Sequence, residues 1–287
     1  MTNSVCIETK ELKFSYPDGP PVLHGISATI NRGDFVAVIG QNGSGKTTLA
    51  KHFNGLLRPN CGEVCLFGES IADKQVSDLA QHVGYVFQNP DHQIFSATVR
   101  EELNFGPRNL GLDKATVDRR TDAALEYFAL TSVADRQPAV LGFGLRRKVS
   151  IASVYSMQTP VLILDEPTSG LDLKSTNDLM KLVGELNRLD HTIVIITHDM
   201  RIVAEYVPRC MVIRAGEIVA YDTTREIFRH EKLLRETQIS LPQISELGKR
   251  MTAHGMRDDV LTVSEFCEAY SGMLATATEG NRSADNH

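Results

Sequence analysis

The sequence predicts an α/β fold with a parallel sheet at its core. Three short segments, 35–39, 161–164 and 192–196, are continuously apolar, which is typical of strands buried on both faces. Between the last two, residues 173–189 carry apolar side chains at helical spacing behind Asp172, a residue type that commonly caps helices. A strand, a helix and a second strand at this spacing form a parallel unit.

The middle of the chain has a different pattern. From about residue 90 to 157 the apolar spacing is mostly helical. Thr98 and Glu101 form a capping pair, and apolar residues over 115–128 predict a further helix. We therefore expect a helical insertion in the α/β core.

Antiparallel strands are expected on both sides of the first apolar segment. Residues 5–30 and 62–67 have strand-like composition broken by Gly and Pro turns. Near the other end, Gly216 precedes a short strand and a helix capped at Thr223.

The chain divides into a main domain and a small addition. We assign residues 1–228 to the main domain, and 229–287 to a small C-terminal helical appendage that is rich in charge as far as Tyr270. The residues from Ala275 onward are small and polar, so we expect them to be frayed.

Composition excludes several classes of protein. The 287 residues are 42% hydrophobic and 23% charged, with a net charge of −6, as in an ordinary globular chain. This acidic balance is unsuited to binding nucleic acid by bulk charge. No apolar run approaches the ~20 residues that span a bilayer. Residues 1–10 lack a signal-peptide pattern, so we expect the chain not to be exported.

The five cysteines do not suggest a disulfide framework, because their number is odd. Cys61 and Cys65 are the one close pair, and a zinc site would need two further ligands that the nearby sequence does not supply. Free thiols in a reducing cytosol are the simpler interpretation.

A phosphate-binding motif follows the first apolar segment. Residues 40–47 fit G-x-x-x-x-G-K-[ST], with a buried strand before them and a helix expected over 48–57. Glycines let backbone N–H groups surround anionic oxygens, and a helix N-terminus adds its dipole. A chance Gly-rich turn is the alternative, which the flanking strand and helix disfavour. The candidate nucleotide-binding residues of this phosphate loop are Gly40, Gln41, Asn42, Gly43, Ser44, Gly45, Lys46, Thr47 and Thr48.

Lys46 is expected to reach the β- and γ-phosphates, and the Thr47 hydroxyl to ligate Mg²⁺. Asp165 and Glu166 end the second apolar strand. Asp165 suits the Mg²⁺ shell, and Glu166 suits a catalytic base that polarises the attacking water. His198 follows the third strand and falls on the same carboxyl edge, where it is either catalytic or structural.

These motifs, over about 5–228, resemble those of an ATP-binding cassette (ABC) ATPase. The resemblance implies ATP and Mg²⁺ as cofactors. It also implies that Tyr16 stacks on adenine, that Gln88 contacts the metal and senses the γ-phosphate, and that His198 contacts the γ-phosphate. Residues 169–172, Ser-Gly-Leu-Asp, resemble the loop that crosses to a partner cassette.

Three segments of the sequence resemble the ATPase subunits of energy-coupling factor (ECF) transporters. These segments are 14–18, 51–59 and 88–107. Such ATPases import vitamins or transition-metal ions such as cobalt and nickel. The resemblance implies a second ATPase, a membrane coupling protein and a substrate-capture membrane protein as partners, and a peripheral location on the cytoplasmic face of the cell membrane. It also implies that the appendage helps the ATPases to pair.

One motif departs from the family. The family signature, Leu-Ser-Gly-Gly-Gln, grips ATP bound to the partner, and the matching segment here is 141–145. In this signature segment Gly142 lacks the serine hydroxyl, Phe143 adds a side chain, Gly144 is retained, and Leu145 replaces an amide. Losing one preorganised donor costs ~10²–10³ in rate. We therefore expect an asymmetric pair with a second, intact ATPase; a homodimer that tolerates the changes is the alternative.

Two other functions remain open. ABC ATPases that act in repair or assembly usually carry two cassettes, coiled coils, zinc modules or basic arms, and this sequence shows none of them. A GTPase or small-molecule kinase would also use a phosphate loop, but no Asn-Lys-x-Asp guanine motif occurs. A transport motor is the preferred prediction.

Overall fold

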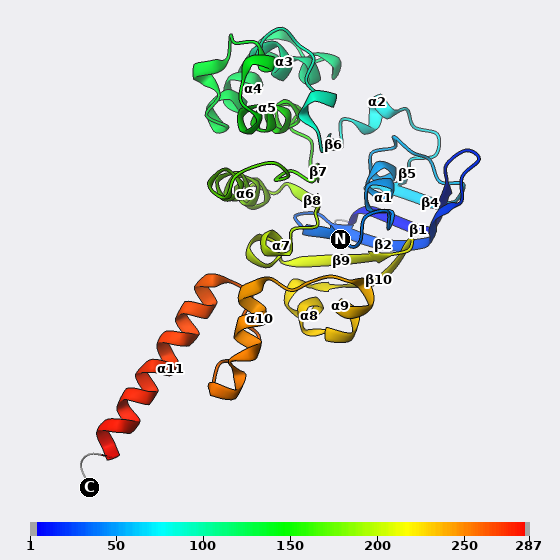
Figure 1. Cartoon of the computed structure of the whole chain (residues 1–287). Helices are drawn as coiled ribbons and strands as arrows, with labels where there is room; N and C mark the ends of the chain where they lie inside the picture. The colour runs from blue at the N-terminus through cyan, green and yellow to red at the C-terminus, as the bar shows by residue number, and fades with distance from the viewer. Residues whose placement is uncertain (1–4, 285–287) are drawn as a thin grey trace.

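The structure, a computed structural model, describes residues 5–284, with side chains to residue 274. Figure 1 shows a central sheet, a second sheet beside it, a group of helices at the top and another group at the bottom. The central sheet and its loops lie between the other three parts.

The central sheet is parallel except at one edge. In the described chain its six strands have the order β10-β9-β3-β8-β7-β6. β3 pairs in parallel with β8 and β9, β7 pairs in parallel with β8 and β6, and the edge strand β10 is antiparallel to β9. The bounds are β3 Phe35–Ile39, β6 Val83–Val86, β7 Val161–Asp165, β8 Thr192–Ile196, β9 Arg209–Arg214 and β10 Glu217–Thr223.

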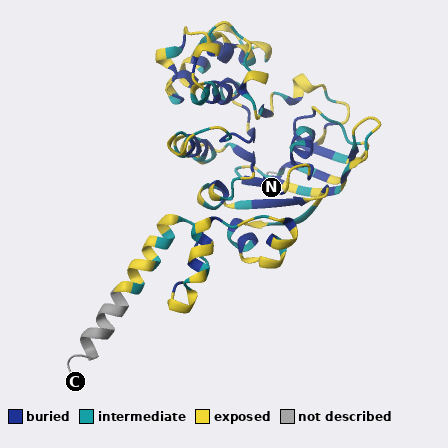
Figure 2. Cartoon of the chain, viewed as in Figure 1, coloured by how far each residue is buried: buried dark blue, intermediate teal, exposed yellow. Residues whose placement is uncertain are grey.

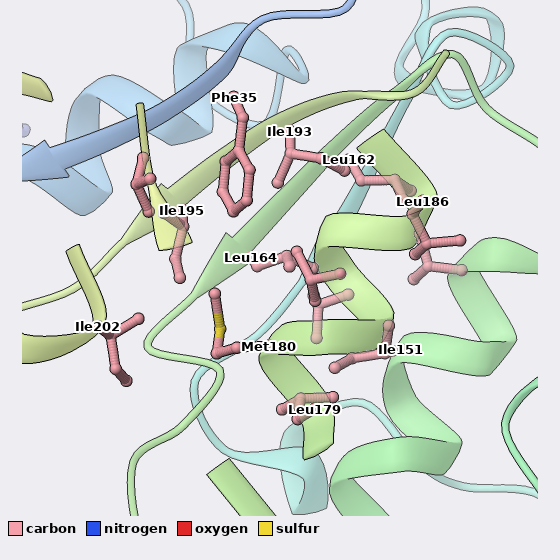
Figure 3. Packing of buried hydrophobic residues seen from close by; sticks show 14 of the residues in the cluster. Phe35, Ile151, Leu162, Leu164, Leu179, Met180, Leu186, Ile193, Ile195 and Ile202 are labelled. Atoms are coloured by element: carbon pink, nitrogen blue, oxygen red, sulfur yellow. The ribbon is translucent and has the colours of Figure 1, made fainter. Parts of the chain in front are cut away.

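Both faces of this sheet are buried, because successive side chains point to opposite sides. Phe35 and Ala37 of β3 join one hydrophobic cluster, and Val36 joins the other. Figure 3 shows the first cluster, where strand residues such as Leu164 lie against Met180 of helix α6 (Leu173–Arg188). This two-sided burial confirms the interpretation of the three apolar segments.

The second sheet is antiparallel, as expected. Its order is β2-β1-β4-β5, and β1 pairs with both β2 and β4. The bounds are β1 Val5–Ser15, β2 Pro21–Asn31, β4 Cys61–Leu66 and β5 Glu69–Ser70. Residues of this sheet and of helix α1 (Lys46–Phe53) share the second hydrophobic cluster with the central sheet.

The helix after the phosphate loop differs from the prediction of 48–57. It starts at Lys46 because the turn of the loop already ends at Gly45, and it ends at Phe53. Gly55 then takes a left-handed φ of 72° and donates its N–H to the His52 carbonyl, 3.2 Å away. A left-handed residue after the last turn is a common helix stop.

Helices form the upper group, where a helical insertion is expected. The Thr98 hydroxyl accepts the N–H of Glu101 at 3.1 Å, so the expected N-cap is present. The helical bounds are α3 Val99–Asn109, α4 Lys114–Tyr127, α5 Phe143–Tyr155, and short 3₁₀ turns at Pro90–His92, Thr131–Val133 and Pro138–Val140.

Three more helices, α2, α6 and α7, lie outside the upper and lower groups. Asp172 caps α6 by accepting the Ser175 N–H at 2.8 Å, as expected. The remaining bounds in this part are α2 Val76–Leu79 and α7 Met200–Tyr206.

The lower group contains the appendage. The Thr223 hydroxyl caps α8 by accepting the N–H of Glu226 at 3.2 Å. Figure 2 shows that α11 is exposed or half-buried from residue 263 to 274, whereas α10 has both buried and exposed residues. The bounds are α8 Thr224–Arg229, α9 Glu231–Thr237, α10 Gln243–Arg250, a 3₁₀ turn at Thr252–His254, and α11 Val263–Ala284.

The end of the chain differs from the frayed tail expected from Ala275. The backbone of α11 is helical as far as Ala284, and residues 285–287 lie outside the described residues. Alanine has the highest helix propensity, so a small, polar composition does not by itself end a helix. Within residues 5–284, none of the helices combines the length and apolarity needed to cross a bilayer.

The turn between β9 and β10 supports the phosphate loop. Gly216 donates its N–H to the Ser44 carbonyl and accepts the His24 N–H, both at 3.0 Å. Its φ is 79°, and a Cβ there would lie 2.2 Å from the Val22 carbonyl oxygen. Both sheets therefore meet the loop at a position that admits only glycine.

We predict that Gly216→Ala lowers the free energy of unfolding by roughly 2–4 kcal/mol, since it adds a backbone clash to an unfavourable φ. Gly111→Ala is the matched control, because Gly111 has a φ of 75° and open space around it. The control should lose only about 1 kcal/mol. Urea unfolding measures both, and equal losses would show that the close approach at Gly216 is unimportant.

Candidate active site

The phosphate loop connects β3 to α1. Gly40 has a φ of 145°, and a Cβ there would lie 2.1 Å from the Ile213 carbonyl oxygen, so the loop starts where only glycine fits. Gly43, at the tip, has open space where its Cβ would be. The loop is therefore closed against the sheet at its base and open to a ligand at its tip.

Lys46 lies inside this loop. Its Nζ donates to the carbonyl oxygens of Gly40, at 2.9 Å, and Gln41, at 2.7 Å. The residue is only 7% exposed, and this burial lowers the pKa of the Lys46 ammonium. A buried cation without a paired anion is well placed to bind an incoming anion.

Ser44 gives independent evidence that the loop fits phosphate. Within the described residues, its buried Oγ has no hydrogen-bond partner. Buried polar atoms in native proteins normally have partners, which include ligands and water. An unpaired hydroxyl beside Lys46 suits the oxygens of a phosphate group.

Asp165 ends β7 beside the helix that starts at Lys46. Its Oδ1 accepts a long hydrogen bond from Thr47 Oγ1, at 3.5 Å, and its Oδ2 accepts one from the Tyr85 hydroxyl, at 2.8 Å. Burial raises the pKa of Asp165, and the hydrogen bond from Tyr85 opposes that rise. A carboxylate next to a hydroxyl is an oxygen donor set that fits Mg²⁺, which keeps several waters and binds few protein ligands.

Glu166 follows directly and takes a left-handed φ of 44°. Its N–H donates to the Ile196 carbonyl at 2.8 Å, which fixes this turn to the end of β8. The carboxylate Oε1 lies 2.7 Å from His198 Nδ1, and Oε2 accepts a longer bond from Thr197 Oγ1 at 3.4 Å. The pairing of β7 with β8 therefore brings the predicted base and the predicted histidine together.

One cavity of about 420 Å³ collects most of the predicted residues. Tyr16 stands at its rim, 42% exposed, with its hydroxyl 3.2 Å from Thr48 Oγ1. The predicted residues that line this cavity, called here the nucleotide cavity, are Tyr16, Asn42, Gly43, Gly45, Lys46, Thr47, Thr48, Gln88, Asp165, Glu166 and His198. Gly40, Gln41 and Ser44 do not line it, although Gly40 and Gln41 border a second cavity of about 850 Å³ next to the appendage.

The signature segment lies away from the nucleotide cavity. Gly142 precedes α5, and Gly144 and Leu145 line a separate cavity of about 260 Å³. The Phe143 ring comes within 3.0 Å of the point where a Cβ on Gly170 would be, so it packs against the loop over 169–172. The segment is thus placed to act on something other than this chain's own nucleotide cavity.

Two residues near the site were not predicted. Tyr85 holds Asp165, and nothing in the apolar pattern of β6 distinguishes it. Arg147 is fully buried and donates to the carbonyls of Phe87 and Gln88. Its position could have been found, because it falls on the same stripe of α5 as the buried Ile151 and Val154.

Comparison with known proteins agrees with this geometry. The family model described as "ABC transporter" matches residues 23–169. The energy-coupling factor transporter ATP-binding protein EcfA of Methanothermobacter thermautotrophicus is 42% identical over 262 residues, covering 90% of this chain and 84% of that protein.

Solved structures share the fold. The structure of cbiO1 from Clostridium perfringens, described as part of the ABC transporter complex cbiONQ, has a TM-score of 0.74 and 36% identity over 85% of this chain and 99% of that one. A dimeric ATP-binding cassette in a post-hydrolysis state, bound to ADP and phosphate, has a TM-score of 0.69 and 25% identity over 76% of this chain and 99% of that one. The predicted fold class, an ABC cassette with its parallel core and antiparallel sheet, is confirmed.

Proposed function

The chain belongs to the family of ABC transporter ATP-binding proteins, and from this premise we propose that it is the ATP-hydrolysing subunit of an ECF-type importer for vitamins or transition-metal ions. The observation that carries the proposal is that Lys46, Asp165 and Glu166 line the same cavity. The 42% identity to an energy-coupling factor ATPase supports the same function. In this proposal residues 1–228 form the ATPase cassette, with its insertion at about 90–157, and 229–287 form an appendage that helps the ATPases to pair.

ATP would bind with its phosphates in the phosphate loop. The backbone N–H groups and Lys46 would bind the phosphate oxygens. Tyr16 stacks on the adenine from the rim of the cavity. Thr47, Asp165 and Gln88 would hold Mg²⁺, which supplies positive charge against the phosphates when bound.

Hydrolysis needs a base in line with the γ-phosphate. Glu166 would accept a proton from water as the water oxygen bonds to the γ-phosphorus, and the bond to the bridging oxygen breaks to leave ADP. His198 holds Glu166 through the 2.7 Å contact and would face the γ-phosphate from the same edge. Both the proton transfer to Glu166 and the release of ADP would use groups that line the nucleotide cavity. The one additional group would be a donor from the signature of a neighbouring subunit.

We propose that this neighbour is a second, different ATPase. Its intact signature would complete the cavity over Lys46, while the signature segment of this chain would face the partner's nucleotide with weakened contacts. A serine hydroxyl is missing at Gly142 although the space for it is open, so sterics do not explain the loss. Phe143 instead fills the space beside Gly170.

A docking surface for the membrane coupling protein is proposed on the insertion. Phe95 and Phe105 are 65% and 46% exposed, and their rings meet edge to face with centroids 4.7 Å apart. Exposed aromatic pairs are typical of the centres of protein interfaces. The coupling protein, with its substrate-capture partner, would hold this chain at the cytoplasmic face of the membrane, and no nucleic acid is expected as a partner.

Two substitutions separate binding from hydrolysis. Lys46→Ala should weaken ATP binding roughly 10–100-fold, because it removes charge-assisted hydrogen bonds to phosphate. Glu166→Gln should leave the dissociation constant of ATP within about threefold and abolish turnover, since the amide cannot accept the proton. Calorimetric titration and phosphate release measure the two effects. Normal hydrolysis by Glu166→Gln would show that another group is the base.

Asymmetry is tested with the signature segment. The wild-type chain alone should turn over slowly, and the combined changes Gly142→Ser, Phe143→Gly and Leu145→Gln should raise its rate by up to ~10²–10³, as expected for a restored donor. Leu173→Gln, at a nearby exposed position, is the control for added polarity. Near-full activity of the unaltered chain, without a second ATPase, would support the homodimer instead.

Membrane attachment should depend on the two exposed aromatic residues. In cells, a tagged chain should sediment with membranes, and the double variant Phe95→Asp with Phe105→Asp should shift most of it to the supernatant. Val140→Asp is the control, since Val140 is 71% exposed on the same insertion. If the wild-type chain sediments with ribosomes or remains in the supernatant, the transport assignment fails and a role in repair or assembly is favoured.

A further inference from the structure

Arg147 is a buried charge that the proposed mechanism does not use. It lies on α5 within the basic run Arg146–Lys148, yet its exposed fraction is 0%. Burying a guanidinium is costly unless its donors are satisfied. Within the described residues it forms no ion pair closer than 4 Å with a carboxylate, so its partners must explain why it is there.

Its partners are backbone carbonyls of a single loop. Arg147 Nη1 donates to the Phe87 carbonyl at 2.8 Å, and Nη2 donates to the Gln88 carbonyl. A planar guanidinium can donate to two neighbouring acceptors at once, whereas an ammonium is a point charge. Arg147 Cζ also lies over the Phe143 ring, 5.6 Å from the ring centroid.

The same loop is fastened to α5 at its far end. Gln93 Nε2 donates to the Ser150 carbonyl at 2.6 Å and to Ser153 Oγ at 3.2 Å, while Gln93 Oε1 accepts the Phe87 N–H at 3.2 Å. The loop over residues 87–93, called here the Gln88 loop, is therefore bonded to one helix at both of its ends. These contacts would couple a displacement of α5 to Gln88.

Gln88 lines the nucleotide cavity, and α5 begins at the signature segment. We propose that Arg147 is a positioning residue that fixes Gln88 in the nucleotide cavity and thereby links the signature helix to this chain's own ATP. The link to ATP rests on the proposed function. The contact between Arg147 and the Gln88 loop does not depend on it. Through this contact α5 would position Gln88 in this subunit, although the signature segment at its start has lost its polar groups.

The first measurement needs no nucleotide. Arg147→Met keeps an unbranched side chain and removes the guanidinium donors, so amide hydrogen exchange over 87–93 should speed up at least about tenfold, while exchange in β7 and β8 stays unchanged. Lys148→Met is the matched control, because Lys148 lies on the same helix and has no hydrogen bond or ion pair with residues 87–93 in the described part of the chain. Unchanged exchange in the Arg147 variant would overturn the proposal.

The second measurement tests the coupling to Gln88. With the partner ATPase present, Arg147→Met should lower kcat about 10–100-fold with KM within about threefold, as outer-shell substitutions typically do. In a Gln88→Ala background the same change should have no further effect on kcat. An equal loss of kcat in both backgrounds would mean that Arg147 does not act through Gln88.

If Arg147→Met fails to fold, Arg147→Lys is the second variant to measure. It retains the charge but lacks the planar fork that holds two donors in a fixed geometry, so its exchange and kcat should lie between wild type and Arg147→Met. A wild-type value for both quantities would contradict the two-carbonyl contact. Absence of ATP binding by the wild-type chain would instead refute the proposed function and leave the exchange result standing.

Discussion

The parallel pairing of β3, β7 and β8 is the constraint on which the site depends. Because β8 pairs with both of the other strands in the same direction, the carboxyl ends of all three meet at one edge. The phosphate loop leaves β3 there, Asp165 and Glu166 end β7, and His198 follows β8. Residues more than 150 positions apart in the sequence, such as Lys46 and His198, thereby come to line the same nucleotide cavity.

Burial sets the chemistry at that edge. Lys46 and Asp165 are both nearly inaccessible, and burial lowers the pKa of the lysine and raises that of the aspartate, so each charged form lacks stabilisation by water. A bound triphosphate and its cation would restore that stabilisation. The Glu166 side chain is 11% exposed and that of His198 is 66% exposed, so the histidine lies at the more open side of this pair.

The sequence was sufficient for the parts of the fold that follow local rules. Continuous apolar runs predicted the buried strands, and Asp172, Thr98 and Thr223 predicted helix starts that the structure confirms. It was insufficient where a contact joins distant segments. Nothing near Tyr85 indicates a bond to Asp165, and although the apolar stripe of α5 indicates that Arg147 is buried, its acceptors are backbone carbonyls 59 and 60 residues away, which the sequence does not indicate. The helix after the phosphate loop starts earlier than predicted because the turn of the loop ends at Gly45, and it ends earlier because Gly55 is a stop.

The most direct test of the account is the structure of the assembled Glu166→Gln complex, with its second ATPase and membrane proteins, in the presence of Mg²⁺ and ATP. The account predicts one ATP between Lys46 and Asp165, covered by the intact signature of the other ATPase, and a looser contact where Phe143 faces the second nucleotide. A phosphate loop that stays open to water in the closed complex, or two identical sites made by two copies of this chain, would contradict it.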